Sequence, residues 1–191
     1  LAAFNSKVLT NNKLWERVSL VYEKRNESNL TKEQIRVSEL YYEMFKRAGA
    51  VLSETQKKRY TDIMQNLAEL GTKFSQNLLS DESNWCLSLD ESDLDGLPEF
   101  VINSMSQAAL DRDVKGYALT LSRSILEPFL QFSSNRKLRE KAYLAWSSRG
   151  MNGGDTDNIN IAKETLTLRT ERANILGYNS FADFKLENQM A

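Results

Sequence analysis

The amino-acid sequence predicts a mostly α fold: a multi-helix lobe with a small two-stranded antiparallel β pair. Apolar residues recur at spacings of three and four over most of the chain, which is the pattern of one helix face. Only two short stretches, 85–90 and 115–122, alternate apolar and polar residues as strands do. The 191 residues are 41% hydrophobic, which is enough to fill a core and argues against a disordered chain.

Two short helices are expected at the start of the chain. Phe4 and Val8 form one apolar face, and Asn11 and Asn12 then break the pattern. A second apolar face follows this break and contains Leu14, Trp15, Val18, Val21 and Tyr22. We therefore expect two helical pieces ahead of the longer helices.

The next two helices are longer, and each should begin at a capping box, in which a Ser or Thr and a Gln three residues later satisfy backbone N–H groups. Thr31 and Gln34 provide the first box, and Ser53 and Gln56 provide the second. Gly49 should end the first of these helices. Because the link between them is short, we expect the two helices to pack antiparallel.

Each of these two helices carries an apolar stripe that should face a core. The stripe of the first helix contains Val37, Leu40, Tyr41, Met44, Phe45 and Ala48. The second helix should run to about residue 79, and its stripe contains Tyr60, Ile63, Met64, Leu67, Leu70, Phe74 and Leu78.

A change of period marks the β pair. Between the two alternating stretches, DGLPEF supplies a turn and then a proline-initiated helix through about Leu110. Two such strands should pair antiparallel and need a helical layer against them. Helical spacing resumes at 125–132, 135–149, 157–176 and from Ser180 to the end of the chain.

MNGGDTDN, residues 151–158, is the one loop rich in glycine and polar residues, and we expect a flexible surface loop there. The chain shows no repeat of fixed period and no low-complexity linker. The simplest organisation is therefore a single helical unit over residues 1–191.

The charge balance bears on the partners that the chain can bind. Twenty-five basic and 26 acidic residues produce no overall field to attract nucleic acid or an anionic membrane. No apolar run approaches the roughly 20 residues needed to cross a bilayer. We therefore expect neither nucleic acid nor a membrane as a partner.

The single cysteine, Cys86, cannot form an internal disulfide and should be a small buried residue on a strand.

The chain contains no histidine, which narrows its possible chemistry. Zinc sites with His ligands and the Ser-His or Cys-His pairs of nucleophilic enzymes need that residue. One cysteine also excludes an all-cysteine zinc site. Only carboxylate and lysine chemistry remains.

Acidic residues gather between Lys73 and Arg112, a span without a basic residue. Solvated turns and helix N-termini explain most of these charges. The alternative is a site for a hard cation or an acidic surface for a basic partner. The eight residues are Asp81, Glu82, Asp90, Glu91, Asp93, Asp95, Glu99 and Asp111.

Basic residues gather on the helix expected at 135–149, where Arg136, Lys137, Arg139 and Lys141 could bind phosphates. Because an apolar stripe of Leu138, Ala142, Ala145 and Trp146 occupies the same helix, the basic residues are more simply its solvated side.

Further along, in the helix expected at 157–176, Arg169 lies on an apolar stripe and should be buried. A buried arginine needs a partner, either in a structural ion pair or on a substrate.

The chain resembles the thimet-type zinc oligopeptidases, and within them bacterial peptidyl-dipeptidase, the dipeptidyl carboxypeptidase branch. The resemblance rests on the number and order of the matching blocks, since none of them is a catalytic motif. In chain order the blocks are LAAFNSKVL, FKRAGAVLSETQKKRY, LAELGTKFSQNLL, DLDGLP, KGYALTLSRSILEPFLQFSSNRKLREKAYLAW, NGGDTDN, LRTERANILGYNSFADF and NQMA.

This resemblance implies a bilobed, almost entirely helical, cytoplasmic enzyme with a deep channel between its lobes. In that family two histidines of H-E-x-x-H and a later glutamate hold zinc, and the motif glutamate activates the metal-bound water. Those residues have no counterpart in this sequence. No position here is therefore expected to be catalytic, to bind a cofactor or to ligate a metal, and the chain corresponds to the non-catalytic N-terminal lobe.

The leading hypothesis is a fragment of a zinc peptidyl-dipeptidase that removes C-terminal dipeptides from oligopeptides. By resemblance the fragment forms one wall of the substrate channel, is inactive without the C-terminal catalytic lobe, and binds no zinc itself. Two alternatives remain open. The parent protein can be an oligopeptidase that cuts internally, or the chain can be a stand-alone helical interaction module.

Overall fold

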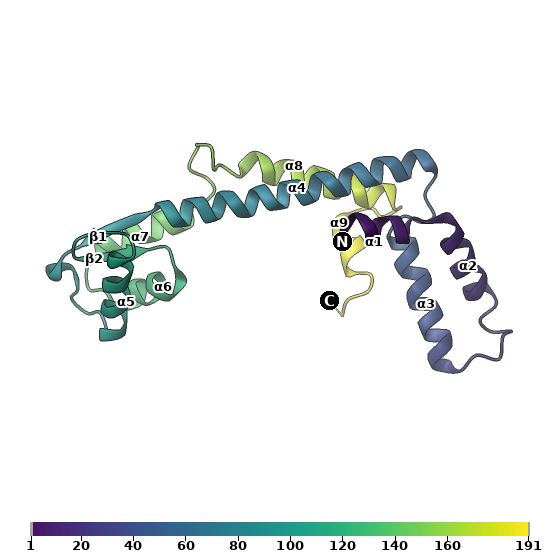
Figure 1. Cartoon of the computed structure of the whole chain (residues 1–191), viewed down its shortest axis with the longest axis horizontal. Coiled ribbons are helices and arrows are strands. Elements are labelled where there is room, and N and C mark those ends of the chain that lie inside the picture. The colour runs from purple at the N-terminus through teal and green to yellow at the C-terminus, as the bar shows by residue number, and fades with distance from the viewer. Residues whose placement is uncertain (1, 191) are drawn as a thin grey trace. The chain divides into compact units, whose positions relative to one another are not determined.

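The fold is mostly helical, as the sequence predicts. The computed structural model describes residues 2–190, and over that range it contains nine α-helices, one short 3-10 helix and one two-stranded antiparallel sheet (Figure 1). The described chain groups into two compact units, one made of residues up to 69 and from 164 onward, the other of residues 70–163. The single helical unit expected over residues 1–191 stays a prediction about domains.

The first unit is entirely helical. The helix α4 (Glu54–Asn84) begins in this unit and ends in the second, and α8 (Ile159–Ile175) begins in the second and ends here. The remaining helices of the first unit are α1 (Ala2–Leu9), α2 (Asn12–Glu23), α3 (Lys32–Arg47) and α9 (Phe181–Leu186).

Local capping sets the start and end of α3 and the start of α4. The backbone N–H of Thr31 donates to the Gln34 side chain, and the N–H of Gln34 donates back to the Thr31 hydroxyl. Ser53 and Gln56 make the same reciprocal pair before α4. Gly49 follows α3 with φ of 91°, a left-handed conformation that favours glycine. Both capping boxes and the helix end are confirmed.

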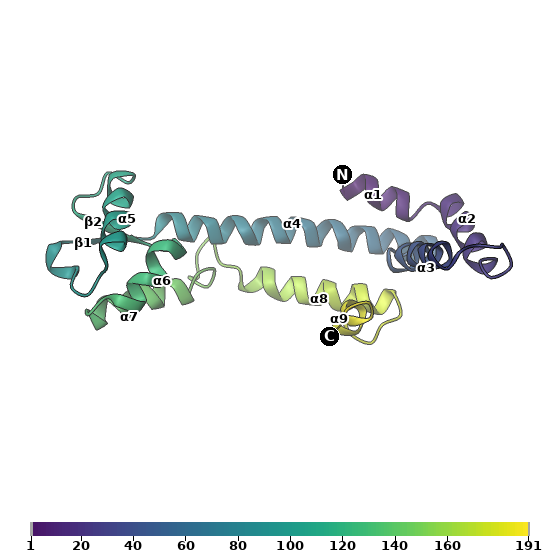
Figure 2. The ribbon, with the colours of Figure 1, turned by 90° about the horizontal axis from the view of Figure 1, so that it is seen from below.

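The expected antiparallel pairing of α3 with α4 is wrong. The partner of α3 is α2, which lies beside it in Figures 1 and 2. The rings of Tyr22 and Tyr42 stack at 3.9 Å between their centroids, and Trp15 lies 5.0 Å from Tyr42. These aromatic contacts attach α3 to the helix that precedes it.

The last helix is held by an arginine of α3. Arg47 donates to the carboxylate of Glu187, to the hydroxyl of Tyr178 and to the carbonyl oxygen of Phe184. The side chain of Phe184 is buried beneath these contacts. The helix α9 ends at Leu186, so the prediction that it continues to the end of the chain is wrong.

The expected burial of Arg169 is also wrong, because that residue is exposed. The partly buried arginine of α8 is Arg172, three residues later. Its guanidinium lies 4.9 Å from the centroid of the Phe184 ring, and Nη2 donates to the hydroxyl of Tyr60 over 3.1 Å. Arg172 therefore stabilises the packing of α8 between α4 and α9 in a structural role.

The second unit combines the β pair with helices. Its core is apolar and contains Leu89, Val101, Met105, Leu119, Leu126 and Phe129 among its buried residues. Its own elements are β1 (Cys86–Leu89), the 3-10 helix η1 (Glu91–Asp93), α5 (Glu99–Leu110), β2 (Tyr117–Thr120), α6 (Arg123–Phe132) and α7 (Arg136–Ser147).

The β pair is antiparallel, with Cys86 opposite Thr120 and Leu89 opposite Tyr117. Because two strands alone are marginal in water, they need a packed layer, and α5 and α6 supply it on β2. Cys86 is partly buried on β1. Gly116 immediately precedes β2 with φ of 86°, and a Cβ there would meet the carbonyl oxygen of Leu89 at 2.6 Å. The predicted pair and its helical support are confirmed.

Candidate functional site

The loop after α7 is fastened to the last turns of α4 by one carboxylate. Asp81 accepts hydrogen bonds from the backbone N–H of Gly150 at 2.7 Å, from the amide of Asn152 at 2.8 Å and from the hydroxyl of Thr156. These three donors come from residues 150–156, about 70 positions away in sequence. The flexible surface loop expected at 151–158 is therefore a loop with fixed anchor points.

The pKa of Asp81 reflects this anchoring. Partial burial alone would raise the pKa of its carboxyl group, because it disfavours the charged form. The hydrogen bonds from Thr156, Gly150 and Asn152 favour the carboxylate, and together they lower the pKa below its usual value. The carboxylate thus remains charged and bound to the loop at neutral pH.

We expect Asp81→Asn to destabilise the protein at neutral pH by about 1–3 kcal/mol, since charge-assisted hydrogen bonds are lost and a donor is turned toward other donors. Because folding lowers the pKa of Asp81, its contribution is full above the unfolded value of about 4 and is lost as pH falls through the folded value. The difference between the wild type and the variant, measured by urea denaturation, should therefore shrink between pH 5 and pH 2.

Asp155→Asn is the matched control, because Asp155 is an exposed carboxylate of the same loop. This variant should leave the free energy of unfolding within about 0.5 kcal/mol of the wild type. Equal effects of the two substitutions would show that charge removal, and not the anchoring of the loop, is being measured.

An arginine just after α7 lies next to this loop. The guanidinium of Arg149 stacks on the ring of Trp146, with 3.4 Å from Cζ to the ring centroid, and it pairs with the carboxylate of Glu82. Its Nε donates to the carbonyl oxygen of Trp146 over 3.0 Å. Burial lowers the pKa of Arg149, but the ordinary value is so high that the group stays charged.

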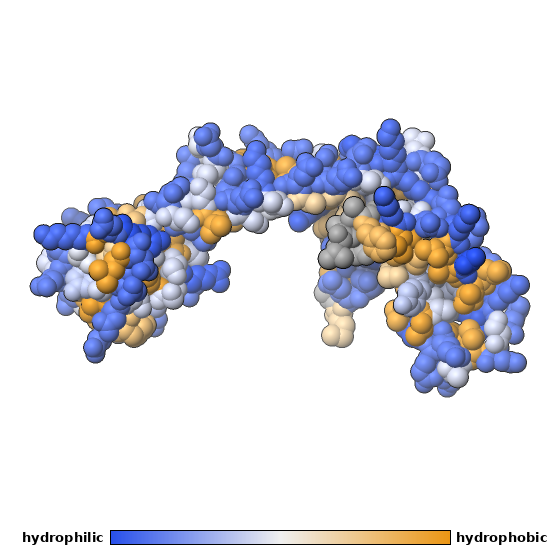
Figure 3. Space-filling view, in the orientation of Figure 1, coloured by the Kyte–Doolittle hydropathy of each residue, from blue (hydrophilic) through white to orange (hydrophobic). Residues whose placement is uncertain are grey.

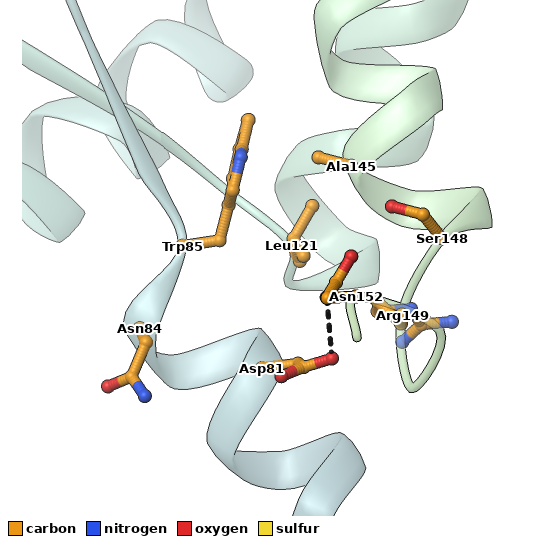
Figure 4. Close-up of a pocket in the computed structure, with 8 residues that line it drawn as sticks. All are labelled: Asp81, Asn84, Trp85, Leu121, Ala145, Ser148, Arg149 and Asn152. Carbon is orange, nitrogen blue, oxygen red and sulfur yellow. Dashed lines mark hydrogen bonds between the residues drawn. The ribbon is translucent and has the colours of Figure 1, made fainter. Parts of the chain in front are cut away.

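These groups surround a pocket of about 370 Å³ within the second unit. Figure 4 shows Trp85, Leu121, Ala145 on α7, Ser148 just after that helix, and the hydrogen bond between Asp81 and Asn152. The complete lining is Asp81, Asn84, Trp85, Leu121, Ala145, Ser148, Arg149 and Asn152.

The lining can bind a small polar or aromatic group, but its chemistry is limited. Trp85 offers an aromatic surface, while the carboxylate of Asp81 and the guanidinium of Arg149 already have partners within the chain. Ser148 is the hydroxyl group of the pocket, and no histidine exists in this sequence to take its proton. The pocket thus offers a bound molecule an aromatic surface and one hydroxyl group.

The acidic residues singled out in the sequence do not converge. Asp81 holds the loop, Glu82 pairs with Arg149, and Asp90 caps the 3-10 helix by accepting from the N–H of Ser92 at 2.8 Å. Among residues 2–190, no group of three His, Cys, Asp or Glu side chains is placed to hold a metal ion. The described side chains therefore do not fit the zinc that the family resemblance implies.

The basic helix α7 is solvated on one side, which agrees with the interpretation of its basic residues as a solvated helix side. Arg136, Lys137 and Lys141 are exposed, while Arg139 donates to the carbonyl oxygen of Ser133. Ala142 is buried in the core of the second unit.

In the described part of the chain, no helix is long and apolar enough to cross a membrane.

Sequence reasoning singled out Asp81 as an acidic residue but did not bring the pocket residues together, because they are far apart in the chain. Helical periodicity identifies apolar faces, but Asp81 and Asn152 lie on polar positions and meet through a loop. The only signal was the Asn-Gly-Gly stretch, which predicts a turn and says nothing about its anchor.

Residues 129–191 match the model of peptidase family M3. Oligopeptidase A of Haemophilus influenzae is 38% identical over 152 residues, which are 77% of this chain and 22% of that protein. Dipeptidyl carboxypeptidase of Escherichia coli is 28% identical over 193 residues, covering 100% of this chain and 28% of that protein. The chain thus spans about a quarter of the length of these relatives, and the resemblance to this peptidase family is confirmed.

Proposed function

We propose that this chain, a relative of peptidase family M3, is part of the non-catalytic N-terminal lobe of a zinc metallopeptidase that acts on oligopeptides. The supporting observation is that the whole chain aligns with a dipeptidyl carboxypeptidase of which it spans 28%. On this proposal the zinc ligands and the catalytic residues belong to the rest of the protein. The cytoplasmic location implied by the resemblance is part of the same proposal.

The lobe would form one wall of the substrate channel. A narrow channel excludes folded proteins sterically and strengthens electrostatic interactions at a metal by excluding water. A wall needs rigid elements rather than catalytic groups, and the helices and anchored loop of the second unit supply such a surface. The pocket beside Trp85 and Arg149 is the part of this surface that can contact a peptide.

Two specificities are supported by different observations. Release of C-terminal dipeptides is supported by the alignment over the whole chain with the dipeptidyl carboxypeptidase. Internal cleavage is supported by the higher identity to oligopeptidase A, which is 38% over 152 residues. We propose the first and keep the second as the alternative.

We expect residues 1–191 alone to release no product from an acylated oligopeptide, with or without added zinc, because no group of three His, Cys, Asp or Glu side chains among the described residues is placed to hold the metal. The longer protein encoded by the same gene should hydrolyse the peptide, and a chelator should abolish the activity. Chromatography of the products measures both. Zinc-dependent turnover by residues 1–191 would contradict the assignment as a non-catalytic lobe.

The same assay separates the two specificities. A peptidyl-dipeptidase should release the terminal dipeptide from a free carboxyl end and should lose at least tenfold in rate on the C-terminally amidated peptide. An internal oligopeptidase should cut both peptides at similar rates. A reading frame without H-E-x-x-H would favour the stand-alone interaction module instead.

A further inference from the structure

The helix α3 carries four large apolar side chains that face solvent along one side. Val37, Leu40, Tyr41 and Met44 expose 51%, 52%, 53% and 41% of their surface, respectively. Their spacings of three and four put them on one helix face, which we call the outer face of α3. Single exposed apolar residues are common on proteins, but four adjacent ones on one face are not scattered.

The outer face is distinct from the side of α3 that packs on α2. Ser38 and Phe45 are the buried residues of α3, and Tyr42 stacks on the ring of Tyr22. The remaining side of the helix is charged, with ion pairs from Arg36 to Glu39 at 3.1 Å and from Lys46 to Glu43 at 3.7 Å. Thus α3 has two apolar sides, and only one of them is covered.

The pair of α2 and α3 is thinly packed in this chain. No residue of α2 is fully buried, and α3 buries only two. Figure 3 shows apolar side chains gathered on the surface over these helices. Since most helix stability in proteins comes from burial of an apolar face, this pair needs a cover to become as stable as an ordinary packed hairpin.

We propose that the outer face of α3 binds a helical segment from the rest of the same polypeptide, an inference that rests on the proposed function. The aligned relatives are several times longer than this chain, which spans 22% or 28% of their length. A longer protein of that size offers an intramolecular partner at high effective concentration. The residue expected to insert most deeply is Tyr41, because large aromatic side chains dominate such contacts.

The charges beside the outer face favour a protein partner over a membrane. Helices that lie on membranes have a polar side rich in Lys and Arg. Here the polar side alternates both signs, through the pairs of Arg36 with Glu39 and of Lys46 with Glu43. An uncharged, apolar protein surface fits this face, and an anionic lipid surface does not.

The test compares thiol labelling of Leu40→Cys in residues 1–191 and in the longer protein, read by mass spectrometry of the peptide that contains residue 40. We expect labelling to be at least tenfold slower in the longer protein. Lys46→Cys is the matched control, because Lys46 is exposed on the charged side of the same helix, and its rate should change less than threefold.

Equal labelling rates at residue 40 in the two proteins would overturn the proposal. So would a reading frame that adds nothing to residues 1–191, or protection in the short chain that increases with its concentration, which would indicate a second copy on this face. Peptide hydrolysis by the longer protein is assayed separately. Protection without hydrolysis would reject only the proposed function, and hydrolysis without protection would reject only the covered face.

Discussion

Phe129→Ala is expected to lower the free energy of unfolding of the second unit by about 3–5 kcal/mol. Phe129 lies on α6 with 0% of its surface exposed, in the same core as Met105 and Leu126. Truncation to alanine removes most of an aromatic side chain from a closely packed interior and leaves a cavity. Denaturant unfolding followed by circular dichroism measures the loss, and hydrogen exchange over 99–132 should become faster.

Phe132→Ala is the control for this prediction, since Phe132 ends the same helix and exposes 40% of its surface. Its replacement should cost about 1 kcal/mol or less, because a partly solvated ring loses less burial and leaves no closed cavity. If the two variants were destabilised equally, the core of the second unit would not be centred on α6.

The sequence predicts the helices and the β pair well because their signals are local. A capping box involves residues three apart, and Thr31 with Gln34 behaves in the structure as the sequence indicates. The strands at 86–89 and 117–120 are equally local, since alternation of side chains is a property of each strand alone. Neither signal depends on which other element lies nearby.

The packing partners were harder to predict because periodicity shows that a face is apolar without showing what covers it. The stripe of α3 contains Phe45, which is buried, and Leu40, which is half exposed. Arg169 and Arg172 differ by three positions and lie on the same side of α8, yet only Arg172 reaches Tyr60. Such differences depend on long-range contacts that are absent from a local pattern.

The candidate site was not predictable for the same reason. Its residues come from the end of α4, the residue before β1, the residue after β2, the last turns of α7 and the following loop. The prediction that no position of this chain is catalytic or ligates a metal stays a prediction. What the structure adds is the anchor of the loop, in which a lowered pKa at Asp81 accompanies three donors.

The end of that loop contains a second polar anchor, formed by Asn158. Its side chain is only 3% exposed. Its amide donates to the carbonyl oxygen of Phe74 at 3.0 Å, and its side-chain oxygen accepts from the amide of Asn77 at 2.9 Å. Its backbone carbonyl also accepts from Ala162 in the first turn of α8. One residue therefore joins the loop, α8 and α4.

Asn158→Ala is expected to destabilise the second unit by about 2–3 kcal/mol. The substitution leaves the amide of Asn77, itself 9% exposed, without its partner in a site that water reaches poorly. Leaving one buried donor unpaired costs about 1–3 kcal/mol, and the lost bond to Phe74 adds to that cost. Urea denaturation gives the change in stability, and hydrogen exchange over 150–162 should become faster.

Asn160→Ala provides the matched comparison, because Asn160 lies two positions later, in the first turn of α8, and is exposed. Its replacement should change the free energy of unfolding by about 0.5 kcal/mol or less. The double variant Asn77→Ala with Asn158→Ala should then be less destabilised than the sum of the two single variants, since the second substitution removes a donor that has already lost its acceptor. Strict additivity would mean that the hydrogen bond between the two amides contributes nothing, and that the Asn158 side chain acts through its bond to the carbonyl oxygen of Phe74 instead.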